Sequence, residues 1–382
     1  MDAQASGRSL RRGIPFPCAA IGRAMRTRQI TPAGVASACY FRSSEIAPGR
    51  KALVQITERC NLHCAHCFVS ATRDGRDMAP ALIESQLLPR LQSARVRRLT
   101  LTGGEPFAHP QVIDIAAMAR QAGMGLTICS NATLIEPEAM AALDDLGARV
   151  NVSLDGFSAR GHGKFRGAPS SFEQTVETMR LLGERGLLKG VLVTPNRLAA
   201  VSEYEELCEF ARRCGAEYVL MNPLSPLGRG NAGIRRLGAS EEFMRAIAVE
   251  TAGVERAGLE LVRIRFPNDA RPLSACEAGT ILYVFAEGDV TVCPYLVFAA
   301  RTPGSCHDPG EFVVGNIFDN EDLAERLDRY PLRERVKVRR DPTCEGCAIG
   351  EHCGGGCPAA VVAAGGRIGE RDRDQCPIED AV

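Results

Sequence analysis

The sequence predicts an α/β fold, in which a partial (β/α)6 TIM-like barrel is followed by a small cysteine-rich α+β domain. From residue 51 to residue 221, short β-prone runs alternate with helical segments, a pattern typical of parallel βαβ units. The 16 cysteines gather mainly near residue 60 and after residue 340, and the second place has little core-forming periodicity. A length of 382 residues suits two or three domains.

Six strands and five helices are expected in the barrel, in strict alternation. The strands are predicted at 53–57, 98–102, 126–130, 150–154, 191–194 and 218–221. The helices are predicted at 80–94, 110–122, 137–146, 172–185 and 203–214. Several of these helices begin with Pro or an acidic residue, as helix starts should. Six strands instead of eight indicate an incomplete barrel, and such folds place their chemistry at the C-terminal ends of the strands.

Four segments are expected along the chain. They are a loosely ordered N-terminal arm at 1–50, the barrel at 51–230, a linker with a bridging helix at 231–270, and the cysteine-rich domain at 271–382. The arm has eight Arg and only two carboxylates. Pro and Gly residues across 222–240 predict a loop or linker. A helix near 240–257, a strand near 259–265 and a hairpin of 281–286 with 290–293 are expected to follow.

Composition excludes several classes of function. The 46 basic and 46 acidic residues balance, whereas a general nucleic-acid binder needs a basic excess. No apolar run approaches the roughly 20 residues of a membrane span, so no membrane partner is expected. Without an export signal the protein is expected to be cytoplasmic, where thiols stay reduced. Clustered cysteines then indicate a metal site or catalysis.

Cys60, Cys64 and Cys67 directly follow the first predicted strand. Three thiolates on one loop can hold three irons of a [4Fe–4S] cluster and leave the fourth iron open to another ligand. They can equally form a zinc site, in which His63 or His66 supplies the fourth ligand. The spacing alone does not separate these two interpretations.

A second motif, Gly103-Gly104-Glu105-Pro106, follows the second predicted strand. Together with the cysteine loop it resembles the radical S-adenosylmethionine (SAM) superfamily, over residues 51 to about 222. The resemblance implies that the three cysteines are catalytic, through a [4Fe–4S] cluster whose open iron binds the amino and carboxylate groups of SAM. It also implies reductive cleavage of SAM to a 5′-deoxyadenosyl radical, which abstracts a hydrogen from the substrate.

The resemblance further implies a set of SAM-binding residues. These are His66, Gly103, Gly104, Glu105, Pro106, Ser130, Asn131, Ser153 and Arg166. The Gly-Gly-Glu motif would hold the SAM ammonium, and Ser130-Asn131 would contact the cofactor at the end of the third strand. Ser153 and Arg166 match positions that bind the SAM carboxylate in related enzymes, and His66 would lie beside the adenine.

Seven further cysteines resemble the SPASM extension of radical SAM enzymes, which carries two auxiliary iron–sulfur clusters. These are Cys276, Cys293, Cys344, Cys347, Cys353, Cys357 and Cys376. The resemblance assigns one cluster to Cys344, Cys347, Cys353 and Cys376, although a zinc ribbon is an alternative for 344–357. It assigns the other to Cys276, Cys293 and Cys357, with Cys306 as the fourth ligand or with an open iron.

The five remaining cysteines are scattered along the chain. They are Cys18, Cys39, Cys129, Cys208 and Cys214. They are expected to pack as small hydrophobic residues, because free cysteine is among the most often buried residue types.

Enzymes with this extension mostly modify ribosomal peptides, so a peptide substrate is expected. The change would be a crosslink, an oxidation or a decarboxylation. Pro294, which follows Cys293, stands where sulfatase-maturating enzymes have a catalytic Asp, and this argues against that activity. A tetrapyrrole, sugar or antibiotic intermediate is the alternative substrate, and a non-enzymatic zinc or electron-transfer protein is a further alternative. The expected partners are a separate peptide-recognition protein and a flavodoxin or ferredoxin.

Overall fold

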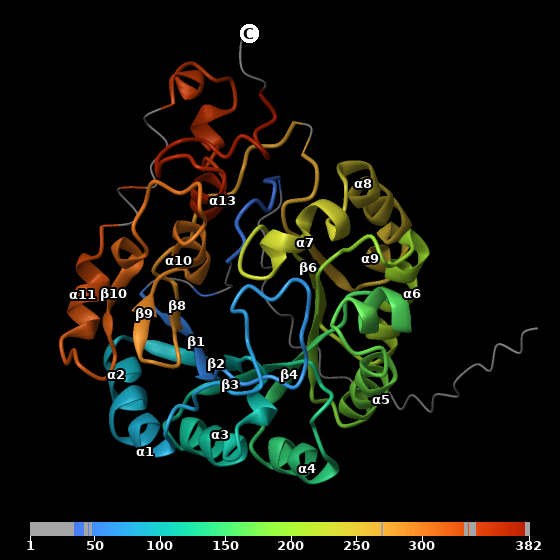
Figure 1. Cartoon of the computed structure of the whole chain (residues 1–382), viewed down its shortest axis with the longest axis vertical. Coiled ribbons are helices and arrows are strands. Elements are labelled where there is room, and N and C mark those ends of the chain that lie inside the picture. The colour runs from blue at the N-terminus through green and yellow to red at the C-terminus, as the bar shows by residue number, and fades with distance from the viewer. Residues whose placement is uncertain are drawn as a thin grey trace, which may run out of the picture.

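The computed structural model describes residues 34–41, 45, 48–268, 270–331, 335 and 341–378. The strands among these residues are β1 (Arg50–Thr57), β2 (Val96–Gly103), β3 (Gly125–Ser130), β4 (Arg149–Ser153), β5 (Leu188–Val193), β6 (Tyr218–Met221), β7 (Glu260–Arg263), β8 (Ile281–Val284), β9 (Asp289–Thr291) and β10 (Val313–Asn316). They form one ten-stranded sheet in the order β10-β9-β8-β1-β2-β3-β4-β5-β6-β7. The sheet curves into an open barrel (Figure 1).

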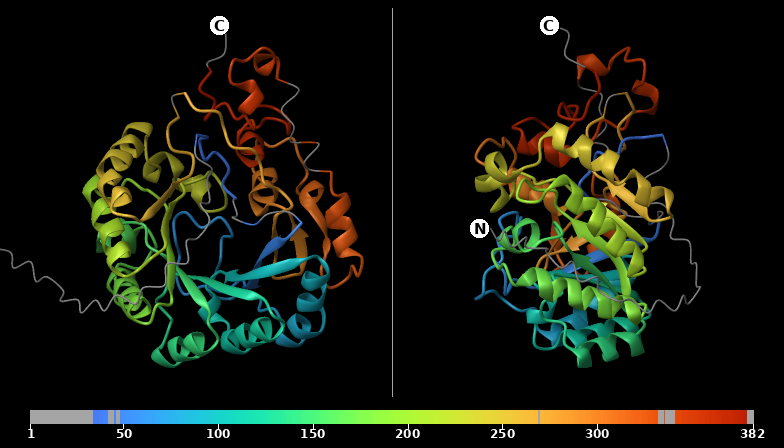
Figure 2. Two further views of the ribbon diagram at one scale, coloured as in Figure 1. Left: turned by 180° about the vertical axis from the view of Figure 1, so that it is seen from behind. Right: turned by 90° about the vertical axis from the view of Figure 1, so that its right-hand side faces the viewer.

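The six predicted strands of the barrel are β1 to β6, and each pairs in parallel with its neighbour. The helices that cover them are α1 (Pro80–Leu82), α2 (Leu88–Ser93), α3 (Val112–Gln121), α4 (Pro137–Asp145), α5 (Ser171–Glu184) and α6 (Val201–Arg213). A π-helical turn joins α1 to α2, and the three pieces together fill the helix predicted at 80–94. The helices lie on the outside of the curved sheet (Figures 1 and 2). The (β/α)6 prediction is confirmed.

The core lies between these helices and the sheet. Helix α3 shows why: Val112, Ile115, Ala116 and Ala119 are its buried residues, and their spacing puts them on one face. This face meets buried strand residues such as Leu99. Burial of such a stripe is the main source of helix stability in a domain.

Two further strands extend the parallel sheet beyond the predicted six. Strand β7, expected near 259–265, pairs in parallel with β6. Strand β8, the first half of the predicted hairpin, pairs in parallel with β1, and its partner β9 runs antiparallel to it. The predicted cysteine-rich domain is therefore connected to the barrel through the sheet itself.

The prediction of a loop or linker across 222–240 is wrong in part. Residues Gly230–Leu237 form helix α7, and α8 (Glu241–Glu250) and α9 (Ala252–Arg256) follow it. Helix α7 lies close to the cysteine loop, since a Cβ added to Gly233 would be 3.7 Å from the backbone oxygen of Ala65. Its two glycines suit this close approach and at the same time weaken the local helix signal.

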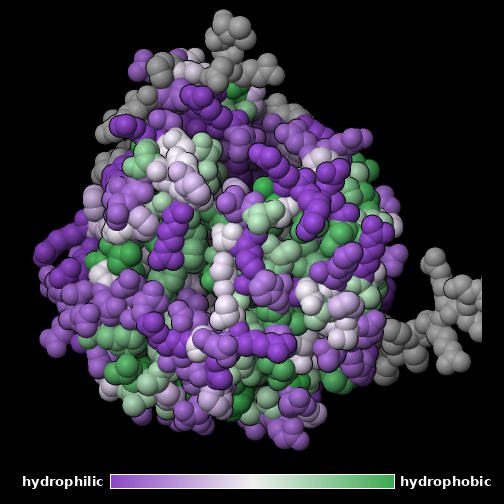
Figure 3. Space-filling view, viewed as in Figure 1, coloured by the Kyte–Doolittle hydropathy of each residue, from purple (hydrophilic) through white to green (hydrophobic). Residues whose placement is uncertain are grey.

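Among the described residues, the C-terminal region includes the short α-helices α10 (Pro294–Ala300), α11 (Leu323–Arg329) and α13 (Pro358–Ala363). The chain near the C-terminus, in red, lies toward the top of Figures 1 and 2, whereas α11 lies at the side of the molecule beside β10 (Figure 1). Hydrophilic residues are frequent on the visible face of the upper part in Figure 3. The described helices include none that is both long and apolar enough to cross a membrane. The predicted N-terminal arm lies outside the described residues up to residue 33.

Candidate functional site

The loop with Cys60, Cys64 and Cys67 lies at the C-terminal end of β1 and is held by backbone contacts. The Arg229 guanidinium donates to the carbonyl oxygens of Cys64 (2.9 Å) and Ala71 (2.7 Å), and the Arg229 amide donates to the Cys67 carbonyl (3.0 Å). Next to Arg229, Gly228 has a φ of +52°, and a Cβ there would lie 2.6 Å from the Cys67 carbonyl oxygen. Only glycine fits such an approach.

The Gly103-Gly104-Glu105 motif lies beside this loop. The amide of Gly104 donates to the Thr57 carbonyl and that of Glu105 to the Arg59 carbonyl, both at 2.8 Å. A Cβ on Gly104 would meet the Arg59 carbonyl oxygen at 2.3 Å, so the two segments touch only because this residue has no side chain. The motif is thereby fixed to the start of the cysteine loop.

Glu105 is almost completely buried and its carboxylate is already hydrogen-bonded by the protein. It accepts from the Ser130 hydroxyl (2.7 Å), the Asn131 amide (2.7 Å) and the Phe107 amide (3.1 Å). Three donors use most of the four acceptor positions of a carboxylate. Glu105 therefore ties the second strand end to the third, and little of its acceptor capacity is left for a ligand.

Asp155 is a buried centre of contacts at the end of β4. Its carboxylate accepts from Arg166 Nε (2.7 Å) and from the Thr194 amide (2.8 Å), and it lies 3.9 Å from His66 Nε2. Burial alone would raise the pKa of Asp155, but the positive charge of Arg166 holds it below its usual value. Burial lowers the pKa of His66 to about 4, so its ring is neutral near pH 7.

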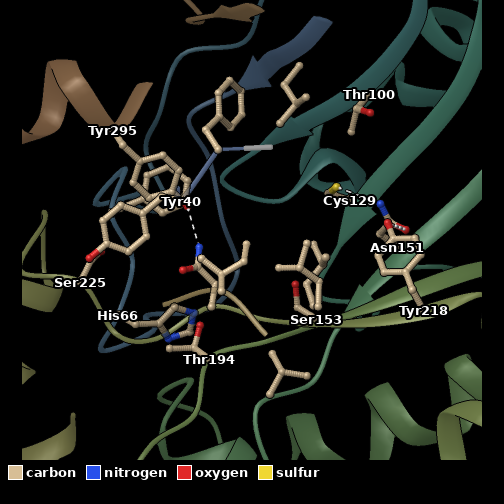
Figure 4. Close-up of a pocket in the computed structure, with 18 of the residues that line it drawn as sticks. Tyr40, His66, Thr100, Cys129, Asn151, Ser153, Thr194, Tyr218, Ser225 and Tyr295 are labelled. Atoms are coloured by element: carbon tan, nitrogen blue, oxygen red, sulfur yellow. Dashed lines mark hydrogen bonds between the residues drawn. The ribbon is translucent and has the colours of Figure 1, made fainter. Parts of the chain in front are cut away.

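A cavity of about 310 Å³ lies inside the barrel at this edge. Of the predicted SAM-binding residues, His66, Ser153 and Arg166 line it. Figure 4 shows Tyr40 and Tyr295 on one side of it and Asn151 with Tyr218 on the other. The rings of Tyr40 and Tyr295 stack with their centroids 5.1 Å apart. The cavity thus combines aromatic surface with a few polar groups, as small-molecule sites commonly do.

The other predicted cofactor-binding residues lie outside the lining of this cavity. Gly103, Gly104, Glu105, Pro106, Ser130 and Asn131 do not line it. The side-chain amide of Asn131 donates to the side-chain oxygen of Asn61, in the cysteine loop, at 3.0 Å. The charges of Glu105 and Arg166 act on the Cys60 thiol, whose pKa is raised by burial to about 11. Gly104, Glu105 and Asn131 therefore contact the cysteine loop and its start without lining the cavity.

Four of the predicted auxiliary ligands line one small cavity in the C-terminal region. Cys344, Cys347, Cys353 and Cys376 border a space of about 70 Å³. The Arg371 guanidinium donates to the Cys376 sulfur at 3.4 Å, and the Leu273 amide donates to the Cys353 sulfur at 3.4 Å. The four thiols come from separate turns of the chain and meet at this one place.

The remaining three predicted ligands, Cys276, Cys293 and Cys357, form a second group. Their thiols lie within electrostatic reach of one another. A fourth thiol, that of Cys39, lies beside those of Cys276 and Cys357, and its sulfur donates to the carbonyl oxygens of Gly356 (3.3 Å) and Ser274 (3.9 Å). Cys306, the alternative fourth ligand, is exposed. Cys39 is buried in the main core, as predicted of a small hydrophobic residue, but its position beside these cysteines was not predicted.

The other scattered cysteines differ in outcome. Cys208 and Cys214 are buried in the main core, as expected of small hydrophobic residues. Cys129 borders the barrel cavity and accepts from the Asn151 amide at 3.7 Å. Cys18 lies outside the described residues.

The donor sets fit iron–sulfur clusters and a polar ligand beside one of them. Two buried polar atoms that belong to cavity-lining residues, His66 Nδ1 and Asn222 Oδ1, have no hydrogen-bond partner in the described part of the chain. Buried polar atoms are normally hydrogen-bonded, so these two atoms suit a polar ligand.

No three Cys, His, Asp or Glu among the described residues are grouped to hold a single metal ion. A four-iron cluster does not need such grouping, because each thiolate binds a different iron. Fold and site thus suit a barrel enzyme whose cysteine loop, at the carboxyl ends of its strands, could hold an iron–sulfur cluster.

Comparison with known proteins agrees with this class. A model of the radical SAM superfamily matches residues 54–223. The antilisterial bacteriocin subtilosin biosynthesis protein AlbA of Bacillus subtilis is 25% identical over 322 residues, which cover 82% of this chain and 68% of AlbA. The AdoMet-dependent heme synthase of Methanosarcina barkeri is 31% identical over 179 residues, which cover 46% of this chain and 51% of that protein.

A similar fold is found in the crystal structure of Streptococcus suis SuiB bound to precursor peptide SuiA. The TM-score is 0.68 at 17% identity, and the match covers 85% of this chain and 75% of SuiB. Residues 54–223 thus form a radical SAM domain, and the chain is a radical SAM enzyme, a class that uses a [4Fe–4S] cluster and SAM.

Sequence reasoning missed three functional candidates. Asp155 has no predicted role, although its position directly after a predicted strand is a usable signal. Arg229 has no predicted role either, because its contacts to the cysteine loop depend on the fold. Cys39 lies more than 230 residues from Cys276 along the chain, so no local pattern connects them.

Proposed function

We propose that this radical SAM enzyme modifies a ribosomally made peptide by a crosslink, an oxidation or a decarboxylation. The identity to AlbA carries the proposal. It covers 82% of the chain, far more than residues 54–223, which the superfamily model matches. AlbA is named for the biosynthesis of a bacteriocin, and SuiB, which has a similar fold, is seen with a precursor peptide.

In this proposal Cys60, Cys64 and Cys67 hold the cluster that binds SAM. Reduced by one electron, this centre supplies a 5′-deoxyadenosyl radical that takes a hydrogen atom from the substrate. The protein orients the reactants: Arg166, fixed through Nε to Asp155, keeps its terminal guanidinium nitrogens for the SAM carboxylate. The stacked rings of His66 and Phe165, with centroids 4.6 Å apart, offer a flat surface for the adenine.

The SAM ammonium is assigned to the backbone of Gly103 and Gly104. Glu105 is a positioning residue in this proposal, because three protein donors already occupy its carboxylate. Pro106, Ser130, Asn131 and Ser153 complete the proposed cofactor-binding set. The cavity walls made by Tyr40 and Tyr295 exclude water and leave room for the reacting part of a peptide.

The C-terminal region is proposed to be a SPASM domain with two auxiliary clusters. Cys344, Cys347, Cys353 and Cys376 hold one, and Cys276, Cys293 and Cys357 contribute to the other. The convergence of the first four thiols on one small cavity supports the assignment. We place the domain boundaries at 51–230 for the barrel, 231–270 for the linker and 271–382 for this domain.

The proposed partners follow from the chemistry. Each turnover needs one electron, so a flavodoxin or ferredoxin is the proposed donor. A separate recognition protein is proposed to present the peptide. Reduced clusters require a reducing compartment, and the protein is therefore placed in the cytoplasm.

A tetrapyrrole is the second candidate substrate, because the heme synthase of Methanosarcina barkeri is 31% identical over nearly half of the chain. This match covers 46% of the chain and 51% of the relative, whereas the match to AlbA covers 82% and 68%. The broader match favours the peptide.

The test uses the full chain, reconstituted anaerobically, with SAM and dithionite. About twelve irons per chain, three clusters of four, and formation of 5′-deoxyadenosine are expected. Precursor peptides encoded beside the gene are then supplied, and their masses are measured. A mass change that requires SAM and disappears in Cys60→Ala supports the proposal. Consumption of a porphyrin such as iron-coproporphyrin, with all peptides unchanged, would overturn it.

A further inference from the structure

The thiol of Cys39 lies in the buried space that holds three proposed auxiliary ligands. Cys39, Cys293 and Cys357 are 2%, 6% and 3% exposed. The Cys39 sulfur is 3.3 Å from the carbonyl oxygen of Gly356 and 3.9 Å from that of Ser274. Gly356 directly precedes Cys357, and Ser274 lies two positions before Cys276. The fold therefore brings the sulfurs of Cys39, Cys276 and Cys357 together from distant segments.

The segment around Cys39 is held in place by backbone contacts on both sides. The Ala36 amide donates to the Pro272 carbonyl, and the Ser274 amide donates to the Ala36 carbonyl, both at 2.9 Å. The Ala38 amide donates to the Ser274 hydroxyl at 3.1 Å. Figures 1 and 2 show this segment, in blue, between the red C-terminal region and the yellow α7. Its position is thus fixed by the fold and not by the thiol alone.

We propose that Cys39 is the fourth protein ligand of the cluster held by Cys276, Cys293 and Cys357. The inference rests on the proposed auxiliary cluster and completes it. Four cysteines match the four irons of a [4Fe–4S] cluster, one thiolate to each iron. The exposed Cys306 is not needed, and no iron remains open to a substrate thiolate or amide.

The closed cluster adjoins the barrel cavity. Tyr40, the residue after Cys39, and Tyr295, two residues after Cys293, both line that cavity and stack on each other. Two of the four proposed ligands are therefore only one or two positions along the sequence from residues that line the cavity. This position suits a cluster that exchanges electrons with groups in the cavity without binding them.

The test first removes the cluster that has an open iron. In the full chain, the triple variant Cys60→Ala/Cys64→Ala/Cys67→Ala is reconstituted anaerobically, and about eight irons are expected. Potassium cyanide, a ligand for open iron sites, is added to the dithionite-reduced protein, and the electron paramagnetic resonance spectrum is recorded. With Cys39 as a ligand, cyanide leaves the spectrum unchanged.

Adding Cys39→Ala to the triple variant is expected to remove about four irons or to make the spectrum respond to cyanide. Cys39→Ser, which keeps the size of the side chain, is expected to retain the cluster with a shifted spectrum. Cys306→Ala tests the rival ligand, and Cys208→Ala tests burial alone. Each of these two changes, added to the triple variant, should leave its iron content and its spectrum unchanged. Circular dichroism reports whether each variant folds.

Two results would overturn the inference. One is a cyanide response while Cys39 is intact. The other is a folded Cys39→Ala protein with the full eight irons and no response. If the triple variant itself binds no iron, the auxiliary clusters are absent, and this part of the proposed function fails with it.

Discussion

The barrel and the C-terminal region hold their thiols by different means. In the barrel, the cysteine loop rests on a sheet whose helix-facing residues, such as Val54, Leu101 and Val152, are at most 1% exposed. After residue 341, the described residues with buried apolar side chains are few and small. They are Cys357, Ala359, Ala360, Val361, Val362 and Ile368.

Buried charge replaces apolar packing in the C-terminal region. Arg265, which follows β7, pairs with Asp372, and both side chains are nearly inaccessible to solvent. Arg371 pairs with Asp341 at 3.2 Å. We therefore expect the barrel to fold without its proposed cluster, and the C-terminal region to depend on its proposed thiol ligation and its ion pairs, as small segments without a full core generally do.

The largest effect that separates the two regions is expected from Cys353→Ala. Loss of one proposed ligand should remove about four irons, loosen the chain after residue 341 and lower product formation at least 100-fold. Cleavage of SAM should continue, because the cysteine loop of the barrel is intact. Iron content, limited proteolysis, 5′-deoxyadenosine and product are measured on one sample.

Cys208→Ala is the matched control, since Cys208 is a fully buried cysteine in α6 of the barrel. It should leave the iron content and the proteolysis pattern unchanged. Full product yield from Cys353→Ala would remove this cluster from the reaction, and an unchanged proteolysis pattern would contradict the proposed contrast between the two regions.

The second prediction concerns the ion pair that joins the regions. Arg265→Met leaves Asp372 charged and buried, and breaking such a pair typically costs about 3–5 kcal/mol. Urea denaturation, followed by circular dichroism, should show a loss of this size. Arg329→Met, at an exposed pair with Glu325 (2.8 Å), should give little change, because solvent screens that pair. Equal losses of unfolding free energy in both variants would show that burial does not make the Arg265–Asp372 pair more important for stability than an exposed pair.

The alternation of strands and helices was predictable because it depends on local periodicity, which each segment carries by itself. The cysteine loop and the Gly-Gly-Glu motif were predictable for a related reason, since each follows a recognisable strand. Helix α7 was not, because Gly230 and Gly233 weaken the local helix signal at the place where the helix approaches the cysteine loop.

Contacts between distant segments account for the rest. The resemblance implies that Glu105 helps to hold the SAM ammonium, but it does not reveal that the Glu105 carboxylate accepts from Ser130 and Asn131 at the next strand end. Cys39 is the strongest case, because its three neighbouring cysteines lie more than 230 residues away in the sequence. A fold is needed before either relation can be seen.

The smallest expected effect would sharpen the view that the barrel site is formed independently of the C-terminal region. Arg166→Lys keeps the charge but loses the fork that can pair with Asp155 and a carboxylate at once. We expect the affinity for SAM to fall about tenfold, equivalent to about 1.4 kcal/mol, with unchanged iron content and unchanged stability of the C-terminal region. Calorimetric titration of SAM into the reconstituted protein measures this. The exposed Arg160, changed to Lys, is the control and should bind SAM normally. Wild-type affinity in Arg166→Lys would show that Arg166 acts only as the partner of Asp155, and the SAM carboxylate would then need another donor.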